Sequence, residues 1–354
     1  MAKKETLIEI EGKTLKLSNL DKVLYPAVGF TKGQVIDYFV RIAPVLLPHL
    51  SDRPLTLKRY PEGVNGMYFY EKNCPKHRSE WVQTAPIYSH GRKDVIQYCL
   101  AQDLPTLVWA ANLADLELHT SLSFGNKIEQ PTMMVFDLDP GPPADIVLCC
   151  QVAFWLKDIF DHLKLQSFAK TSGSKGLQIY VPLNTPVTYD ETKGFSRALA
   201  RLLEQQHPDV VVSDMKKALR VGKIFVDWSQ NDEHKTTINV YSLRAKERPT
   251  VSAPVNWDEV EKCLKKKDAN LLVFDSKQVL ARVKKMGDVF APVLTLKQRL
   301  PSVTELGAES AARPRSRRSA TVSGEAKPKT GQAKKPSRKS VSSSTTAEEA
   351  EQAG

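Results

Sequence analysis

The segment that most constrains the fold of this chain is 131–141, which reads PTMMVFDLDPG. Its four apolar residues, MMVF, predict a short buried strand that ends at Pro140. Successive side chains of a strand point to opposite faces, so Asp137 and Asp139 share one face. Two neighbouring carboxylates repel each other, and a divalent cation between them relieves the repulsion. The segment therefore predicts a cation site at a strand end, although a solvated strand end followed by an ordinary turn explains the same letters.

The net charge of the chain favours a polyanionic partner. Of 354 residues, 41% are hydrophobic and 26% are charged, which is ordinary for a globular protein and names no function. Lys and Arg number 51 against 40 Asp and Glu, for a net charge of +11 and a pI near 9.3. Such an excess is typical of proteins that bind nucleic acid.

The last part of the chain differs in composition from the rest. From residue 301 on it is rich in Ala, Ser, Lys, Arg and Pro and carries +4 of the net charge, which leaves +7 on the body. We therefore expect one catalytic domain over 1–300 and a disordered tail over 301–354. The tail is either a nucleic-acid tether or linker remnant, or a solubilising segment.

Cysteine usage and hydropathy point to a cytoplasmic protein. The cysteines show neither CxxC pairing nor histidines at metal-ligand spacing, so we expect reduced thiols and no zinc site. No apolar run approaches the ~20 residues of a membrane helix, and the first residues do not resemble a signal peptide. The five cysteines are Cys74, Cys99, Cys149, Cys150 and Cys263.

The N-terminal region predicts a hairpin and a capped helix. Alternating apolar and polar residues about a Glu-Gly turn predict the hairpin over 6–20. The helix is expected over 32–47, with a capping box that begins at Thr31. Lys22 and Lys32 either grip a phosphate as point charges or are solvated surface lysines.

A basic and aromatic surface is expected next. A strand over 55–60 carries Lys58 and precedes the aromatic residues 68–70, a combination that suits nucleic acid. An alternating strand buries at least one of three consecutive rings, so one or two should face a ligand, with core packing as the alternative. A helix over 105–117 then precedes His119, which by itself is a structural histidine as readily as a catalytic one.

The segment 167–183 predicts a phosphate-binding turn. Two strands, 167–171 and 177–183, flank the letters SGSKG at 172–176. Backbone N–H groups, hydroxyls and a lysine gathered at one point can cradle a phosphate, whereas an ordinary hairpin turn also favours Gly and Ser. The GxxxxGK[ST] spacing and following helix of a Walker loop are missing.

A third carboxylate completes a possible metal site. An apolar strand over 224–226 delivers Asp227 at its end, and Arg244 follows a further strand. Together with Asp137 and Asp139, Asp227 supplies what a two-metal phosphoryl-transfer site requires. One ion would lower the pKa of an attacking hydroxyl and the other would neutralise a triphosphate.

The motifs FDLDPG, SGSKGL, FVDWSQN, DKVLYP, ELH and YSLR lie within residues 15–260. As a collinear set they resemble the polymerase/primase domain of bacterial ligase D, a branch of the archaeo-eukaryotic primase superfamily used in non-homologous end joining. The resemblance implies an α/β (α+β) body whose mainly antiparallel sheets line a central cleft. It also implies a template-dependent nucleotidyltransferase that uses two Mn²⁺ or Mg²⁺ ions, takes NTP or dNTP substrates and releases pyrophosphate at DNA ends or short gaps with a 5′-phosphate.

The resemblance also assigns roles to individual residues. The implied catalytic metal ligands are Asp137, Asp139 and Asp227. The implied nucleotide contacts are Lys58, His119, Ser172, Ser174, Lys175, Gln178, Gln230 and Arg244. The implied contacts to DNA and its 5′-phosphate are Lys22, Lys32, Phe69, Tyr70 and Arg220.

One position departs from the pattern, because Gln178 stands where the family has His. Glutamine donates hydrogen bonds but stays neutral, and the loss of a charge-assisted bond would weaken nucleotide binding by about 1–2 kcal/mol, or roughly tenfold. The alternative function is therefore a DNA-end binding and bridging module with attenuated catalysis. A remote alternative, a haloacid-dehalogenase-type phosphatase, expects Gly-Thr after the second aspartate, where this chain has Pro140 and Gly141.

The resemblance implies partners as well as residues. It implies a separate DNA ligase and a Ku-like end-binding protein, since we identify no ligase-type lysine motif in this sequence. We expect a cytoplasmic, nucleoid-associated protein with no membrane contact.

Overall fold

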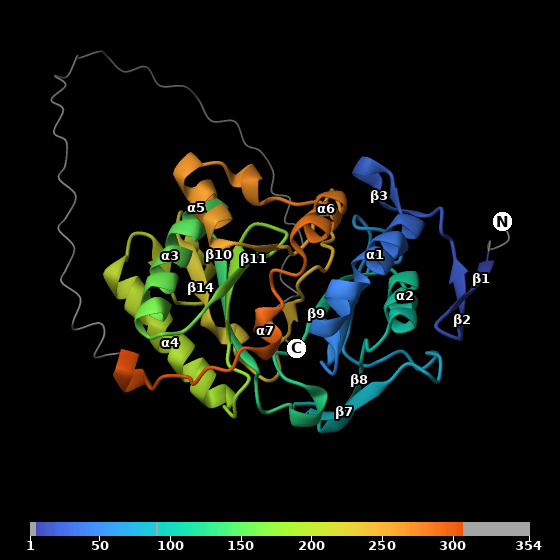
Figure 1. Ribbon diagram of the computed structural model, residues 1–354, viewed down its shortest axis with the longest axis horizontal. Helices are drawn as coiled ribbons and strands as arrows, with labels where there is room; N and C mark the ends of the chain where they lie inside the picture. Colours follow the sequence, from blue (N-terminus) through green and yellow to red (C-terminus); the bar gives the residue numbers. More distant parts are fainter. Residues whose placement is uncertain (1–4, 90, 307–354) are drawn as a thin grey trace, which may run out of the picture. The chain divides into compact units, whose positions relative to one another are not determined.

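A computed structural model describes residues 5–89 and 91–306, all of which belong to one compact unit (Figure 1). Of the predicted disordered tail, residues 301–306 are described and ordered, with Leu306 buried in the core, and the rest lies outside the described residues. The division at residue 300 therefore stays a prediction.

The first of two six-stranded sheets carries the aspartates. Its strand order is β13-β14-β10-β12-β11-β16, and every neighbouring pair is antiparallel except β13 and β14. The strands are β10 (Met133–Pro140), β11 (Phe168–Thr171), β12 (Leu177–Pro182), β13 (Val211–Val212), β14 (Ile224–Asp227) and β16 (Pro254–Val255).

Helices cover one face of this sheet. Phe136 and Leu138 of β10 share a core with α3 (Ile146–His162) and α4 (Tyr189–Gln206). Because side chains alternate along a strand, Asp137 and Asp139 point to the opposite face, away from these helices. That alternation agrees with the interpretation of the sequence.

The second sheet supplies the other side of the site. Its order is β15-β9-β5-β8-β7, with β6 also paired to β5. Helices α1 (Lys32–Leu50) and α2 (Leu104–Asn112) share its core and pack against each other (Figure 1). The strands are β5 (Leu55–Arg59), β6 (Phe69–Glu71), β7 (Thr84–Ser89), β8 (Asp94–Cys99), β9 (Asp115–Thr120) and β15 (Thr237–Ile238).

Smaller elements complete the described chain. The helices are α5 (Trp257–Lys266), α6 (Ser276–Met286) and α7 (Pro292–Thr295), and the short strands are β1 (Glu5–Ile10), β2 (Lys13–Ser18), β3 (Val23–Tyr25) and β4 (Phe30–Thr31). Five 3₁₀ turns cover Pro26–Val28, Gly125–Lys127, Lys217–Arg220, Trp228–Gln230 and Ala269–Leu272. No helix in the described part of the chain is long and apolar enough to cross a membrane.

Several local predictions are confirmed and two are wrong. The hairpin β1–β2 forms, and Thr31 and Gln34 make the expected capping box of α1. The helix expected over 105–117 stops at Asn112, because Asp115 already begins a strand that pairs with β5. All three rings at 68–70 are exposed, by 42–47%, because β6 is a three-residue strand with no sheet neighbour other than β5.

The expectation of reduced cysteines is wrong for one pair. Cys74 and Cys99 form a buried disulfide across 25 residues. Cys74 follows β6 and Cys99 ends β8, and the backbone N–H of Cys74 donates to the carbonyl of Gln97. No short sequence motif reports a contact of this kind. The other three cysteines are free and buried.

Candidate active site

Three carboxylates meet on the open face of the first sheet. Asp137 and Asp139 come from β10, and Asp227 ends β14. The two strands pair with Asp137 directly opposite Asp227. Directly opposed residues on a face have Cβ atoms about 4.5–5.5 Å apart, so the fold brings together the three residues assigned as metal ligands.

The three carboxylates disfavour one another's charge. Burial and then Asp139 raise the pKa of Asp137 well above its usual range, while burial and then Asp227 raise the pKa of Asp139. Oδ1 of Asp137 is buried and has no hydrogen-bond partner in the described part of the chain. A buried oxygen without a donor is costly, and a cation would supply the missing interaction. The donor set is therefore one that Mg²⁺ or Mn²⁺ would fit.

Asp227 is held by its own loop. Its Oδ1 accepts hydrogen bonds from the backbone N–H of Ser229 at 2.9 Å and from the Ser229 hydroxyl at 2.6 Å, and its Oδ2 accepts one from the Gln230 amide at 3.0 Å. As the side chains stand, no group of three or more His, Cys, Asp or Glu residues within 5–89 and 91–306 is arranged to hold a metal ion. An ion bound by all three aspartates would exchange with these hydrogen bonds.

The turn between β11 and β12 has the build of an anion cradle. Ser172 Oγ accepts from the backbone N–H groups of Ser174 at 3.2 Å and Gly176 at 3.1 Å, which closes the turn. Ser174 and Lys175 are exposed at its tip. Burial and then Asp227 raise the pKa of Asp139, and Arg220, Arg244 and Lys175 lower it, so the charge at the tip of the turn lies within electrostatic reach of the carboxylates.

Gly173 lets the turn approach the chain segment around Val251, which follows Arg244 in sequence. Its φ is +69°, and a Cβ there would lie 2.6 Å from the carbonyl carbon of Val251 and 2.7 Å from Cγ of Arg244. The carbonyl of Gly173 accepts a 2.6 Å hydrogen bond from Thr250. A residue with a side chain could not keep this contact without a shift of the backbone.

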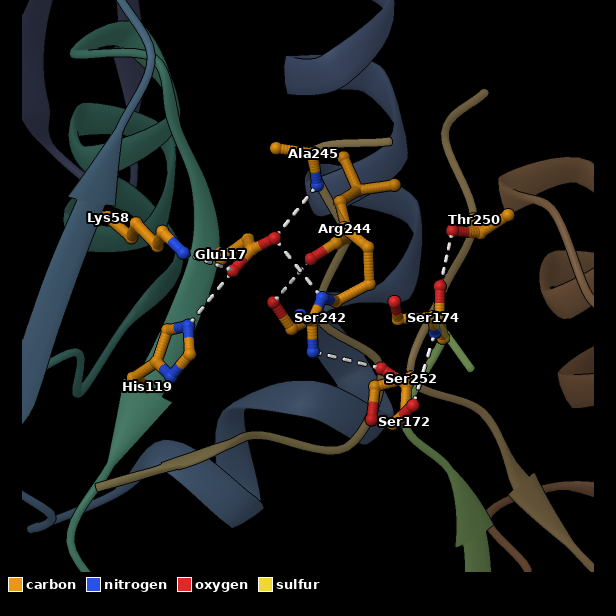
Figure 2. Close-up of polar contacts among 12 residues, drawn as sticks. Lys58, Glu117, His119, Ser172, Ser174, Ser242, Arg244, Ala245, Thr250 and Ser252 are labelled. Carbon is orange, nitrogen blue, oxygen red and sulfur yellow. Dashed lines mark hydrogen bonds and ion pairs between the residues drawn. The ribbon is translucent and has the colours of Figure 1, made fainter. Parts of the chain in front are cut away.

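Glu117 lies at the centre of a cluster of cations (Figure 2). Its Oε1 accepts from Arg244 Nε at 3.1 Å and from the Ala245 backbone at 3.0 Å. Its Oε2 lies 3.1 Å from His119 Nε2 and 3.6 Å from Lys58 Nζ. One carboxylate that is 2% exposed thus positions three residues predicted to contact the nucleotide.

The charges of this cluster shift one another's pKa. Burial would raise the pKa of Glu117, but Arg244, followed by His119 and Lys58, holds it well below its usual range. Burial lowers the pKa of His119, with Glu117 opposing. Glu117 thus lies between two permanent cations, Arg244 and Lys58, and cations at this position suit an incoming polyphosphate.

Arg244 joins the two sheets. While its Nε binds Glu117 of β9, its Nη1 donates a 3.1 Å hydrogen bond to the carbonyl of Ser172 (Figure 2). The same arginine therefore fixes the turn relative to Lys58 and His119. These residues form one continuous polar surface between the sheets.

Gln178 is a buried neighbour of the carboxylates on the adjacent strand of the same sheet. It lies on β12 directly opposite Asp137, is 2% exposed, and its Oε1 accepts a 2.5 Å hydrogen bond from Lys170. A hydrogen bond from Gln178 lowers the pKa of Asp137 against the larger effect of burial. Burial lowers the pKa of Lys170 to about 7, while Asp137 raises it.

The lysines expected to bind a 5′-phosphate lie apart from this cluster. Lys22 pairs with Glu62 at 2.8 Å, and Lys32 donates a 2.6 Å hydrogen bond to the carbonyl of Ser18. Lys32 is only 5% exposed, so it is not the solvated surface lysine that was the alternative. Burial and then the neighbouring Lys22 lower the pKa of Lys32 to about 8. Two cations this close would gain from a shared anion.

Arg220 lies next to the carboxylates in a basic loop, residues 214–223. Its guanidinium lies 3.7 Å from the ring centre of Phe225, the residue opposite Asp139, and donates to the carbonyl of Met215 at 2.6 Å. The loop brings Lys216, Lys217, Arg220 and Lys223 to this edge of the site.

The basic loop is attached to the end of β10 through Gly141. The backbone N–H of Gly141 donates to the carbonyl of Lys223 at 2.8 Å, and the backbone N–H of Gly222 donates to the carbonyl of Gly141 at 3.1 Å. A Cβ on Gly141 would lie 1.8 Å from the carbonyl oxygen of Arg220, so only glycine fits there.

Phe69 and Tyr70 are both partly exposed on β6. They are 47% and 46% exposed on β6, and the Tyr70 hydroxyl shares a 2.8 Å hydrogen bond with Thr236. The ring of Tyr70 also packs edge-on against His119, with centroids 5.9 Å apart. Tyr70, one of the two predicted template-side aromatics, therefore adjoins the nucleotide-side cluster.

A cavity of about 320 Å³ lies beside the phosphate-binding turn. Lys175, Asp145, Thr250 and Phe274 are among the residues that line it. None of the three aspartates lines it, so the chemistry lies outside this cavity.

The structure thus assembles most predicted site residues around one surface. Sequence reasoning did not assign a site role to Glu117 or to the buried Lys170. The ELH motif contained the only signal for Glu117, because it places Glu and His on one face of a strand. Nothing in the sequence distinguished Lys170 from a surface lysine.

Comparisons with known proteins identify the family. A model of the LigD primase-polymerase domain matches residues 31–290. The multifunctional non-homologous end joining protein LigD of Mycolicibacterium smegmatis is 40% identical over 281 residues, which cover 79% of this chain and 36% of that protein. The bifunctional LigD of Bacillus subtilis is 33% identical over 277 residues, which cover 78% and 43%.

A solved structure agrees with these relatives. The polymerase domain of Mycobacterium tuberculosis ligase D, in complex with DNA, matches with a TM-score of 0.74 and 37% identity over 80% of this chain and 99% of that one. This chain spans less than half the length of the LigD proteins above. The chain belongs to the LigD primase-polymerase domain family.

Proposed function

We propose that this chain is a template-dependent nucleotidyltransferase that extends primer 3′-ends at DNA breaks or short gaps. The observation that carries the proposal is the meeting of Asp137, Asp139 and Asp227 on one sheet face, opposite a turn and a cation cluster suited to phosphate. Family membership and the DNA-bound relative support it.

The residues of the chain divide the work. Arg244, Lys58 and His119, held by Glu117, bind the triphosphate and keep its α-phosphate in line with the primer 3′-hydroxyl. The exposed N–H groups and side chains at the tip of the 172–176 turn bind the remaining phosphate oxygens. Two divalent ions on Asp137, Asp139 and Asp227 would lower the pKa of the attacking hydroxyl and neutralise the pyrophosphate that leaves.

The DNA side has its own contacts. Lys22 and Lys32 bind the 5′-phosphate across a gap, and Arg220 binds the strand near the carboxylates. Phe69 and Tyr70 stack on bases of the template side. A separate ligase would seal the extended end, and a Ku-like protein would hold it.

A primer-extension assay tests the proposal. A gapped duplex with a 5′-phosphate is incubated with Mn²⁺ and NTPs, and extension by the wild type is compared with that by Asp139→Ala. The matched control, Asp158→Ala, changes an exposed aspartate of α3. We expect extension by the wild type and the control only. Equal extension by Asp139→Ala would disprove the proposed role of the carboxylates.

A second candidate, a DNA-end binding module with weak catalysis, is favoured by the neutral Gln178 beside Asp137. It predicts tight binding of 5′-phosphorylated ends with negligible incorporation. Gln178→His separates the two candidates, because a large gain in rate would show that glutamine attenuates the enzyme. Strong incorporation by the wild type would exclude this candidate.

A further inference from the structure

Lys170 is a fully buried lysine in the sheet that carries the aspartates. It lies on β11 and is 0% exposed. Lys170 is directly opposite Gln178, which is directly opposite Asp137, which in turn is directly opposite Asp227. The four side chains therefore form a row across four neighbouring strands on one face. We call them the cross-strand row.

The contacts of Lys170 lead into this row. Its Nζ donates to Gln178 Oε1 at 2.5 Å and to Ser252 Oγ at 2.7 Å. Ser252 uses its own hydroxyl proton on the carbonyl of Thr171 at 3.0 Å, so it has only lone pairs to offer Lys170. Both an ammonium and a neutral amine carry N–H groups, so the contact with Gln178 does not depend on protonation of Lys170.

The 2.5 Å hydrogen bond from Lys170, with a longer one of 3.5 Å from the Tyr180 hydroxyl to the same oxygen, decides which way the Gln178 amide points. A primary amide accepts at its oxygen and donates at its nitrogen. With the oxygen held by Lys170, the N–H₂ group is left to face Asp137 on the neighbouring strand. Where Lys170 is an ammonium and Asp137 a carboxylate, the reversed amide would set two donors against each other at Lys170 and two acceptors against each other at Asp137. Such a reversal would leave buried polar groups unsatisfied at both ends.

The consequence falls on Asp137. Its Oδ1 has no hydrogen-bond partner among residues 5–89 and 91–306, so Oδ2 is the oxygen available to the Gln178 amide. A carboxylate held through one oxygen keeps a fixed orientation and presents the other oxygen to a ligand.

We propose that Lys170 is a positioning residue for the carboxylate site, because it fixes the Gln178 amide so that Gln178 donates to Asp137 and leaves Oδ1 open. The inference rests on the proposed function for its catalytic consequence. Its structural part, the orientation of one side-chain amide, stands independently of any reaction.

The structural part is tested by amide hydrogen exchange in the protein without metal or nucleotide. Glutamine side chains are labelled with ¹⁵N, and the Gln178 signal is assigned by its loss in Gln178→Ala. We expect slow exchange in the wild type and exchange at least about tenfold faster in Lys170→Met. Fast exchange in the wild type would overturn the proposal even if Lys170→Met did not fold.

The catalytic part is tested by a double-mutant cycle in the primer-extension assay. Lys170→Met should lower kcat about tenfold, the value of one charge-assisted hydrogen bond, and leave KM for the nucleotide within about twofold. Lys170→Met/Gln178→Ala should be no slower than Gln178→Ala, because Lys170 acts through Gln178. The control Lys266→Met changes an exposed lysine at the end of α5 and should match the wild type.

The remaining outcomes separate the inference from the proposed function. If the effects of the two single substitutions multiply, Lys170 is not a positioning residue for Asp137. The same conclusion follows if the loss of folded protein at the assay temperature, judged from the melting temperature, accounts for the whole decrease in kcat. If the wild type incorporates no nucleotide while exchange at Gln178 depends on Lys170, the proposed function fails and the structural inference stands.

Discussion

Replacing Glu117 by Gln removes the carboxylate that Arg244 and Lys58 share within the described residues and changes the shape of the cluster little. In the wild type, Lys58 and Arg244 share this buried anion, and neither is more than 16% exposed at its side chain. Removing one partner of a buried ion pair typically costs about 3–5 kcal/mol, because the other charge stays buried without compensation. For a domain of this size, roughly 2 °C of melting temperature is lost per kcal/mol, so we expect a decrease of about 6–10 °C.

Thermal unfolding followed by circular dichroism at pH 7 measures this decrease. The matched control is Glu62→Gln, which breaks the exposed ion pair with Lys22 and should cost about 1 kcal/mol or less. Inorganic triphosphate should raise the melting temperature of Glu117→Gln more than that of the wild type, because the ligand replaces the missing negative charge. A decrease no larger than that of Glu62→Gln would refute the view that Glu117 holds the cations.

The same variant has a defined dependence on pH. The pKa of Glu117 is lowered in the folded state, so its stabilising effect is complete above the ordinary value of 4.5 and is lost as the pH falls toward the folded value. The difference in stability between the wild type and Glu117→Gln should therefore be full at pH 7 and smaller below pH 4.5. A constant difference from pH 7 to pH 3 would contradict this assignment.

Two further predictions concern the phosphate contacts. Gly173→Ala should raise KM for the nucleotide and destabilise the fold by about 1–3 kcal/mol more than Gly287→Ala. Both glycines have positive φ, but of the two only Gly173 lacks space for a Cβ. Equal unfolding free energies of the two variants would show that the contact with Val251 is unimportant. Lys32→Met should reduce the preference for 5′-phosphorylated over 5′-hydroxyl ends in a binding assay, with Lys266→Met as control. Because burial and then Lys22 set the pKa of Lys32 near 8, the same preference should decline in the wild type between pH 7 and pH 9, and a preference unchanged by pH would exclude Lys32 as its source.

Local sequence patterns predicted the parts of the site that local physics determines. The period of two along a strand placed Asp137 and Asp139 on one face, and the small residues of SGSKG marked the turn. The helix start at Thr31 followed from its capping box. Each of these features depends on residues within a few positions of each other.

Features that depend on distant contacts were not predictable in this way. Glu117 gains its role from Lys58 and Arg244, which lie 59 residues before it and 127 residues after it in sequence. Lys170 is buried because β11 is an inner strand of its sheet and because Ser252, which is distant in sequence, contacts the lysine amine. The sequence did not predict the disulfide, because strand pairing brings its two cysteines together and no short motif marks them.

The attachment of the basic loop to Gly141 has a consequence for how this site can change. Main-chain hydrogen bonds from Gly141 to Lys223 and from Gly222 to Gly141 set the spacing between the cations of the loop and the aspartates of β10. Side chains in the loop can therefore vary, and with them the preferred DNA end, while the reaction centre stays in place. An insertion or deletion of one residue in the loop would instead displace both the cations of the loop and the reaction centre. We expect natural and engineered diversity in this loop to occur by substitution and rarely by a change of length.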